Sequence, residues 1–322
     1  MSAWRPSSGA DTARRRAALL ARARAYFADA EVLEVTTPAL GRYAASDPNI
    51  DCLTATSGSG RNYFLHTSPE FCMKRLLAAG YPDIYSIGPV YRDGELGQRH
   101  VPEFTMLEWY RLGFGLGEII TDTTRLIAAC LEAPALPESA AVIDYADACR
   151  DFANVDPFDA PVEDLAAGAN ADSQLRDALG DDRDAWLDLL VSTVVAPRLP
   201  PDRLTVIRHY PANQSALARL CPDEPRVADR FEVFCGDMEL ANGYVELTDA
   251  GEQRRRIEAD LDKRRRTGRD VHPWDRTLIA ALEAGLPDCA GVAVGVERLH
   301  MLLEKSGDIR NVMTFAFGTD ND

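Results

Sequence analysis

The sequence predicts an α+β fold, in which strand-like segments and amphipathic helices alternate along the chain without obvious repeats. Apolar residues recur at three- and four-residue spacing over 11–30, which is typical of a helix packed on a core. An apolar run at 84–91, a Gly-rich charged loop and an alternating run at 104–110 together indicate a β-hairpin. With 322 residues, 46% of them hydrophobic, the chain can bury a large core as one domain spanning 1–322.

Composition excludes several classes of protein. The 35 basic and 51 acidic residues give a net charge of −16, which argues against a general nucleic-acid binder. The seven cysteines contain no C-x-x-C pair and are odd in number, which favours reduced thiols over disulfides or a zinc site. Neither a signal peptide nor an apolar run of about 18 residues is present. We therefore expect a cytoplasmic protein with no membrane span.

The first hundred residues alternate between helices and short strands. The helix over 11–30 is followed by a strand at 32–35, which ends at Thr37-Pro38. This helix–strand–proline element is either a subunit contact or an ordinary edge element. Short strands are predicted near Leu53 and at 63–66. Thr67-Ser68-Pro69-Glu70 then predicts a helix start, with a hydroxyl N-cap, proline in the first turn and an early acid; the helix ends at Gly80.

A helix cap alone would explain Ser68 and Glu70 without any function, so that alternative stays open. In the following strand, at 84–91, Pro89 predicts a bulge or a break near the end. A helix is expected over 117–131. Residues 133–200 are acidic and rich in Pro, Ala and Asp, which indicates a mainly helical insertion, with its best-formed helix at 186–195.

The strands that follow the insertion carry unusual carboxylates. Strands are predicted at 204–210, 231–235 and 238–247, and the last contains Glu239 and Glu246. Seven residues apart, these side chains fall on opposite faces of a regular strand. A bulge at Asn242-Gly243 would return them to one face. Two carboxylates and an amide are costly to bury without a ligand or metal, which favours a site over a half-exposed edge strand.

The C-terminal third contains two helices and a glycine-rich strand. The helices are expected from Asp249 to about Arg266 and near 275–284. Glycines alternate with valines over 291–296, and glycines within a strand indicate close approach of a ligand or backbone. Arg298 at the start of the next helix can cover a flat ring or pair with phosphate. A last strand is predicted at 311–317.

The residues that remain for chemistry suit a nucleotide and a cationic solute. No P-loop, dinucleotide fingerprint, H-E-x-x-H or G-x-S-x-G occurs. Basic side chains suited to phosphates are Arg92, Arg99, His100 and Arg298. Glu239 and Glu246 offer oxygens to Mg²⁺, which usually shares its ligands with substrate phosphates. Glu70, Glu108 and Tyr110 suit a cationic substrate.

These segments resemble the catalytic core of class II aminoacyl-tRNA synthetases of the lysine type. E-V-T-T-P at 34–38 is similar to the end of their first motif, YRDGE with RHVPEFTMLEWY at 91–110 to the second, and GVAVGVER at 291–298 to the third. The resemblance covers nearly the whole chain in the right order. It implies an antiparallel sheet flanked by helices, and usually a homodimer through the first motif.

The resemblance also implies roles for individual residues. Arg92 would bind the ATP α-phosphate, and Phe104 and Arg298 would sandwich the adenine. The implied ATP site comprises Arg92, His100, Val101, Phe104, Glu239, Leu240, Gly291 and Arg298. The implied amino-acid site comprises Ser68, Glu70, Glu108, Tyr110, Asn242, Glu246 and Ala293. Glu239 and Glu246 would hold Mg²⁺, while Arg92 and Arg298 would act in catalysis.

Within this class the chain resembles the elongation factor P lysine ligases. Lysyl-tRNA synthetases carry an N-terminal anticodon-binding barrel, whereas here the core helix begins near Asp11, so no such domain and no stable tRNA binding are expected. The resemblance implies activation of lysine or (R)-β-lysine as an adenylate and its transfer to a lysine side chain of elongation factor P. The alternatives are an enzyme that charges tRNA or a small amine, and a catalytically silent amino-acid or nucleotide sensor.

Three positions depart from the pattern. Ala293 stands where lysine-type synthetases usually have glycine, and its methyl group predicts crowding of an α-amino group in favour of the β-isomer. Gly94 replaces a glutamate, with Glu95 beside it as a substitute. Val101 replaces an asparagine, which leaves main-chain contacts to adenine at that point.

Overall fold

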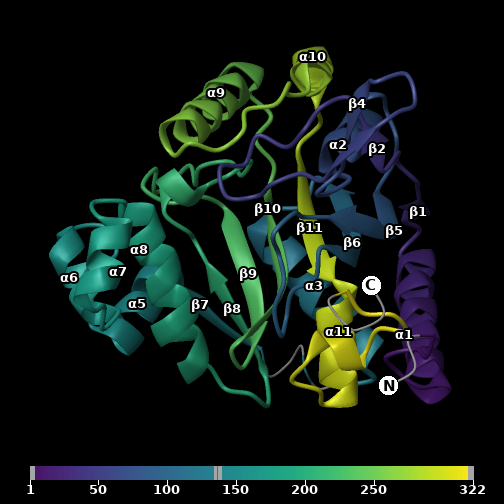
Figure 1. The fold of residues 1–322 in the computed structure, drawn as a ribbon, viewed down its shortest axis with the longest axis horizontal. Helices are drawn as coiled ribbons and strands as arrows, with labels where there is room; N and C mark the ends of the chain where they lie inside the picture. Colours follow the sequence, from purple (N-terminus) through teal and green to yellow (C-terminus); the bar gives the residue numbers. More distant parts are fainter. Residues whose placement is uncertain (1–3, 134–135, 137–139, 318–322) are drawn as a thin grey trace. The chain divides into compact units, whose positions relative to one another are not determined.

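The computed structural model describes residues 4–133, 136 and 140–317, which form two compact units (Figure 1). Unit 1 comprises Met1–Gly113, Ala129–Glu132 and Thr248–Asp322, and unit 2 comprises Phe114–Ala128 and Ala133–Leu247. The first residues of the predicted insertion, 134–135 and 137–139, lie outside the described residues. No described helix is long and apolar enough to cross a membrane.

Unit 1 is built on four neighbouring strands in the order β1-β5-β6-β11. Their bounds are Leu33–Glu34 (β1), Ile84–Tyr91 (β5), Glu103–Leu112 (β6) and Cys289–Gly295 (β11). β5 pairs antiparallel with β6, and β6 with β11, whereas the short β1 pairs parallel with β5. The predicted hairpin is therefore confirmed.

Pro89 does not produce the predicted bulge or break. The β5–β6 register runs without a shift from Ile84 opposite Tyr110 to Tyr91 opposite Glu103. Pro89 lies opposite Thr105, its carbonyl bonds the His66 ring at 2.8 Å, and the Thr105 N–H donates to Glu297 at 2.8 Å. Both groups point away from the β5–β6 ladder, so a proline without an N–H costs the ladder nothing here.

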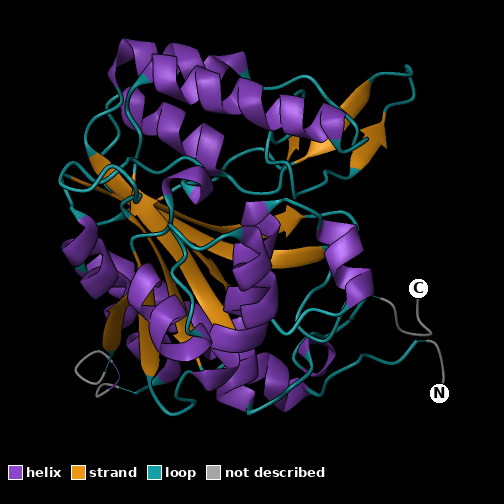
Figure 2. Ribbon diagram, turned by 90° about the vertical axis from the view of Figure 1, so that its left-hand side faces the viewer, coloured by secondary structure: helices purple, strands orange, loops and turns teal. Residues whose placement is uncertain are grey.

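Among the described residues, a small second sheet and five α-helices complete unit 1. The sheet, near the top of both views (Figures 1 and 2), has the order β2-β4-β3. Its strands are Leu40–Gly41 (β2), Thr54–Thr56 (β3) and Asn62–Leu65 (β4), and the helices are Ala10–Asp29 (α1), Glu70–Ala78 (α2), Ala250–Arg266 (α9), Arg276–Gly285 (α10) and Val296–Glu304 (α11). Buried Met73 and Leu77 of α2, Ile257 of α9 and Leu278 of α10 pack in one cluster with Ile84.

The predicted C-terminal strand at 311–317 is wrong. The described residues there form a 3-10 turn, η4 (Ile309–Asn311), followed by turns and bends. Val312 is buried, but Phe315 and Phe317 are 63% and 52% exposed. Apolar side chains alone do not make a strand when no neighbouring strand pairs with them.

Unit 2 is built on the neighbouring strands β10-β9-β8-β7. They span Ala141–Asp144 (β7), Leu204–Arg208 (β8), Arg230–Cys235 (β9) and Met238–Val245 (β10). The chain between β7 and β8 forms Tyr145–Ala153 (α5), Val162–Gly168 (α6), Ser173–Leu179 (α7), Arg183–Leu190 (α8), Val191–Val195 (η1) and Ala196–Arg198 (η2), and Leu116–Leu131 forms α3. β8, β9 and β10 pair antiparallel, and β7 pairs parallel with β8.

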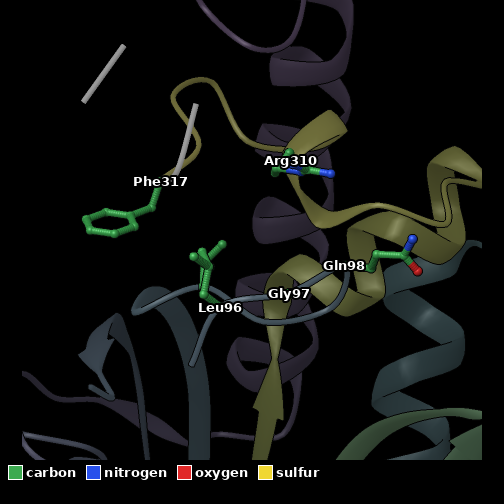
Figure 3. Close-up of a pocket in the computed structure, with 6 residues that line it drawn as sticks. Leu96, Gly97, Gln98, Arg310 and Phe317 are labelled. Carbon is green, nitrogen blue, oxygen red and sulfur yellow. The ribbon is translucent and has the colours of Figure 1, made fainter. Parts of the chain in front are cut away.

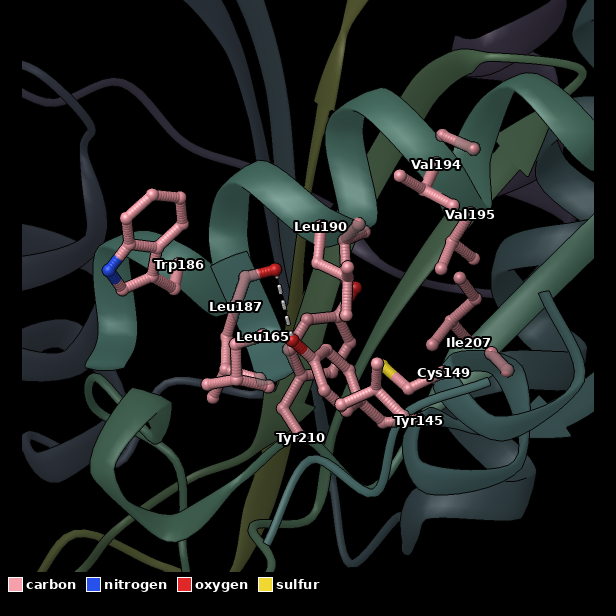
Figure 4. Packing of buried hydrophobic residues seen from close by; sticks show 14 of the residues in the cluster. Tyr145, Cys149, Leu165, Trp186, Leu187, Leu190, Val194, Val195, Ile207 and Tyr210 are labelled. Atoms are coloured by element: carbon pink, nitrogen blue, oxygen red, sulfur yellow. Dashed lines mark hydrogen bonds between the residues drawn. The ribbon is translucent and has the colours of Figure 1, made fainter. Parts of the chain in front are cut away.

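The helices between β7 and β8 pack around an apolar core. Tyr145, Leu165, Trp186 and Leu190 are each at most 1% exposed and pack in one cluster (Figure 4). The Tyr145 hydroxyl donates to the Leu187 carbonyl at 3.4 Å within it. Unit 2 therefore has an apolar centre of its own, despite its acidic sequence.

The bulge in β10 lies at Leu240, not at Asn242-Gly243 as predicted. The register with β9 shifts between Glu239, opposite Phe234, and Ala241, opposite Val233. Asn242 then lies opposite Glu232. Because paired residues share a face, the extra residue returns Glu239 and Asn242 to one face, together with Glu232.

Candidate active site

One face of β6 forms the floor of the candidate site in unit 1. Side chains at 104, 106, 108 and 110 alternate onto this face. Glu108 lies between Ser86 of β5 and Ala293 of β11, and Tyr110 lies opposite Gly291. Because these flanking residues are small, the β6 side chains have room above the neighbouring strands.

Glu108 is the central group of this floor. It is 3% exposed, accepts a hydrogen bond from the Ser68 hydroxyl at 2.7 Å and accepts another from the Tyr110 hydroxyl at 2.8 Å. Burial, and next the charge of Glu70, raise the pKa of Glu108 to about 7, although both hydroxyl hydrogen bonds lower it. A cation bound beside this buried carboxylate would stabilise its ionised form.

Glu70 brings a second acid and its own lysine to the same place. The Lys74 ammonium lies 2.7 Å from the Glu70 carboxylate, one helical turn away, and Lys74 is only 1% exposed. Glu70 and Lys74 together form a buried ion pair at the wall of the Glu108 site. The sequence interpretation missed Lys74, although the i, i+4 spacing from Glu70 is a recognisable signal.

Ser68 links the start of α2 to the site. Its hydroxyl oxygen accepts the Glu70 N–H at 2.9 Å while its proton goes to Glu108. The N-cap itself is Pro69 rather than a hydroxyl residue. The Ser68 hydroxyl therefore both supports the start of α2 and contacts the carboxylate of the candidate site.

The β5–β6 loop holds the predicted phosphate ligand. Arg92 lies 3.6 Å from Glu95, and its guanidinium stands over the Phe104 ring at 5.2 Å from the centroid. Gly94 has a φ of 75°, a left-handed conformation that favours glycine, so the expected glutamate would be strained there. Glu95, one residue on, is the acid that contacts Arg92.

The start of α11 holds the second predicted arginine. A nitrogen of the Arg298 guanidinium lies 2.7 Å from Nε2 of His100, and Nε donates to the Arg99 carbonyl at 3.5 Å. The preceding residue, Glu297, is buried and accepts the Thr105 N–H at 2.8 Å and Arg16 at 3.1 Å. These bonds fix the helix start against β6.

Two small cavities lie in unit 1. One of about 150 Å³ is bordered by Ser86 and Met106 of the β5–β6 floor and by His66. The other, of about 180 Å³, lies beside the loop, where Val101 is buried; its wall includes Leu96, Arg310 and Phe317 (Figure 3). Both border the segments to which ATP and amino-acid contacts were assigned.

Unit 2 holds the remaining predicted residues in a polar cluster on β9 and β10. The Glu232 carboxylate lies 2.6 Å from the Arg230 guanidinium and accepts the Tyr210 hydroxyl at 2.6 Å. Arg230 Nε also donates to the side-chain oxygen Oδ1 of Asn242 at 3.4 Å. Glu239 is partly buried on the same face, whereas Glu246, just beyond β10, is 2% exposed.

This cluster has the donors for a hard cation. Burial, and next the charge of Glu239, raise the pKa of Glu232 to about 7, while Arg230 and Tyr210 lower it. Two like charges on one face favour a divalent cation between oxygen ligands, and carboxylate and amide oxygens are what Mg²⁺ prefers. Glu239, Glu246 and Asn242 fit that role. Leu240 is buried at the bulge.

The sequence interpretation missed Tyr210, Arg230 and Glu232. Glu232 stands in the apolar strand R-F-E-V-F-C. Strand alternation places it on the same face as Arg230 and Phe234. The signal available was a charge at every second position, Arg230 and Glu232, facing the acidic strand that follows.

Comparisons with known proteins agree with this fold. The family model described as tRNA synthetases class II (D, K and N) matches residues 2–319. The chain belongs to that family, which confirms the expected fold class: an α+β core with strands flanked by helices.

Curated relatives narrow the similarity further. Proteins from Photorhabdus laumondii and Mannheimia succiniciproducens are both 40% identical to this chain, over 97% and 99% of it and 97% and 98% of their own lengths. A protein of Klebsiella pneumoniae strain 342 is 41% identical over 97% of both chains. All three are named elongation factor P–(R)-β-lysine ligase.

Proposed function

We propose that this enzyme activates (R)-β-lysine or lysine with ATP and transfers it to a lysine side chain of elongation factor P. The observation that carries the proposal is Glu108, a buried carboxylate whose hydrogen bonds come from two neutral hydroxyls. The relatives of nearly equal length and 40% identity bear the name of this ligase activity.

The amino-acid end of the substrate suits the β6 floor. A lysine side-chain ammonium brought to Glu108 would replace the favourable hydration that burial has removed, and it would restore the ionised carboxylate. Tyr110 and Ser68 orient that carboxylate through their hydroxyls. Ala293, directly opposite Glu108 on β11, forms the neighbouring wall.

The first chemical step needs positioning and charge neutralisation rather than a base. The substrate carboxylate is already ionised at neutral pH, so its oxygen attacks the α-phosphorus of ATP, the bond to the β-phosphate oxygen breaks, and pyrophosphate leaves. Arg92 contributes positive charge at the α-phosphate, and Arg298 with His100 binds the nucleotide. Phe104 offers a flat apolar face to the adenine.

Glu239, Glu246 and Asn242 would hold Mg²⁺, which neutralises phosphate charge when bound. In the second step the acceptor ε-amine attacks the carbonyl carbon of the adenylate. The bond to the AMP oxygen breaks, AMP leaves with its negative charge, and the nitrogen loses one proton to solvent. The product is an amide on the acceptor lysine.

We also propose a homodimer through the first-motif segment. Leu33, Leu40 and Tyr43 are 45%, 47% and 41% exposed, so three large apolar side chains within eleven residues of the chain, which include the short edge strand β1, face solvent. Light scattering of the purified protein measures this directly, and Leu33→Glu should shift the mass toward the monomer. Val142→Glu, an exposed apolar site in unit 2, is the matched control.

The decisive test is intact-protein mass spectrometry of elongation factor P after incubation with this enzyme, ATP, Mg²⁺ and either lysine isomer. We expect a mass gain of one lysyl group that requires ATP. No gain with either isomer would refute the transfer. Pyrophosphate exchange without elongation factor P separates activation from transfer: exchange without transfer would favour tRNA or a small amine as acceptor, and no exchange would favour a silent sensor.

A further inference from the structure

Three side chains of metal-binding type meet in the connection between β8 and β9. His209 directly follows β8, Asp229 directly precedes β9, and Cys221 lies midway between them. One candidate ligand atom from each lies within 4.8 Å of the others. All three residues belong to unit 2, and none takes part in the proposed chemistry.

The backbones of all three residues are fixed. The His209 N–H donates to the Arg230 carbonyl at 2.9 Å, and the Cys221 N–H to the Val227 carbonyl at 2.9 Å. The Asp229 N–H donates to the Arg219 carbonyl at 2.9 Å. The side chains therefore project from an ordered frame, which lowers the cost of ordering them on a ligand.

His209 is held for coordination through one ring nitrogen. Its Nδ1 lies 3.1 Å from the Asp144 carboxylate, which favours a proton on Nδ1 and leaves Nε2 as the lone-pair donor. A carboxylate behind the ring is the usual outer partner of a zinc-bound histidine. His209 also has a φ of 59°, a left-handed conformation that costs free energy in a residue with a side chain.

Asp229 has an outer partner as well. It is 6% exposed, and one carboxylate oxygen bonds Arg219 at 2.9 Å, while the arginine is 40% exposed and can follow a small movement. The second oxygen remains for a cation, in the way that ligating carboxylates are commonly hydrogen-bonded on their other side. A thiolate, a carboxylate and a neutral imidazole carry two negative charges, which balance a divalent ion.

We propose that His209, Cys221 and Asp229 form a Zn²⁺ site with a water or hydroxide as the fourth ligand. A sulfur, nitrogen and oxygen set selects a borderline metal such as zinc and disfavours Mg²⁺. Tetrahedral zinc needs donors about 3.3–3.8 Å apart, so atoms that lie within 4.8 Å of one another close by at most about 1.5 Å when the ion binds.

Bound zinc would cross-link the two ends and the middle of the β8–β9 connection. This connection reaches the end of β10, where the Arg219 N–H donates to the Val245 carbonyl at 2.8 Å and the Leu247 N–H to the Leu217 carbonyl at 3.1 Å. Glu246 stands between these two bonds. Zinc would therefore stabilise the segment that carries Glu246.

The test uses the full-length protein, stripped with a chelator and titrated with Zn²⁺ or Co²⁺ in excess Mg²⁺. We expect one ion per chain and, with Co²⁺, intense visible bands of a tetrahedral ion together with thiolate-to-cobalt charge transfer. Zn²⁺ should also raise the Tm and protect Cys221 from alkylation, read at that peptide by mass spectrometry. The alkylation arm needs no variant.

Cys221→Ser should abolish the charge-transfer band, and Asp144→Asn should weaken zinc binding by about 10–100-fold through His209. Cys235→Ser, at a partly exposed thiol of the same unit, is the matched control and should behave like the parent. A cobalt spectrum unchanged in Cys221→Ser, or equal alkylation of Cys221 with and without zinc, would overturn the proposal.

Discussion

The two units each bury one glutamate with a raised pKa, but the two glutamates are neutralised differently. Burial is the first cause in both, and each pKa is raised to about 7. Glu232 in unit 2 lies 2.6 Å from the Arg230 guanidinium. Glu108 in unit 1 accepts its hydrogen bonds from the uncharged hydroxyls of Ser68 and Tyr110.

This difference indicates that Glu232 has a structural role, whereas Glu108 is suited to bind a ligand. Glu232 is part of an ion pair that the protein completes by itself, and the charge of Glu239 beside it is the one suited to an external cation. At Glu108 the protein supplies orientation, while Glu70 and Lys74 are already joined at 2.7 Å. Lys74 also lowers the pKa of Glu108 through its charge, but its ammonium is paired with Glu70, so we infer that a ligand supplies the cation that pairs directly with Glu108.

The largest effect should come from removing the cation in unit 2. Arg230→Met leaves the partly buried Glu232 and Glu239 on one face without their guanidinium, and should lower the free energy of unfolding by about 3 kcal/mol. Urea unfolding at pH 8 measures it. Arg226→Met, whose exposed pair with Glu224 contributes little, is the control. Equal losses in both variants would contradict a structural role for the Arg230–Glu232 pair.

The second test removes the charge of Glu108. Glu108→Gln keeps the shape and should weaken binding of the lysine substrate by roughly 100-fold, the value of a charge-assisted contact in a buried site. Isothermal calorimetry with lysine and ATP checks this. Unchanged affinity would show that Glu108 is a structural group like Glu232.

The third test compares how the variants Glu108→Gln and Glu232→Gln change the free energy of unfolding. Since the pKa of Glu108 rises from 4.5 to about 7 on folding, the folded state binds more protons between these values, and this contribution to stability falls as pH rises through that window. At pH 8 Glu108→Gln should stabilise the ligand-free protein by about 1–2 kcal/mol. Glu232→Gln should stabilise it less, because this variant also removes the ion pair with Arg230. Equal shifts in the two variants would break the comparison.

A smaller effect is expected from pH alone. Only the ionised Glu108 pairs with an ammonium group, so affinity for the lysine substrate should be about 10-fold lower at pH 6 than at pH 8, given its pKa of about 7. In Glu108→Gln this dependence should disappear. A pH profile that is unchanged in the variant would assign the titration to another group.

The smallest effect concerns the wall opposite Glu108. Ala293→Gly removes one methyl group, worth about fourfold in relative affinity, and should shift the preference toward α-lysine. Competition between the two isomers in pyrophosphate exchange measures the ratio. An unchanged preference would mean that the methyl group of Ala293 does not select the isomer.

The hairpin was predictable because its information is local. Alternation over 104–110, and a Gly-rich charged loop before it, fix which side chains share a face of β6. Ser68 and Glu108, forty residues apart, were placed in one site by the family resemblance and not by spacing. The hydrogen bond itself depends on how α2 meets β6, which no local pattern encodes.

The errors concern features that depend on a partner strand. The β10 bulge was assigned to Asn242-Gly243 from composition, but its position at Leu240 is set by the register with β9. Glu232 was missed for the same reason, because its partners Arg230 and Tyr210 meet it only after β8 and β9 pair. Pro89 was misjudged because its effect depends on which way its nitrogen faces.

The hydrogen bond from the Thr105 N–H to Glu297 has a consequence for how nucleotide would be recognised. Thr105 is bonded to Phe104 along the chain, and Glu297 to Arg298, so one short bond sets the gap between the two groups proposed to enclose adenine. The spacing between Phe104 and Arg298 is therefore fixed before a nucleotide binds. Little ordering entropy is then lost on closing around a flat ring.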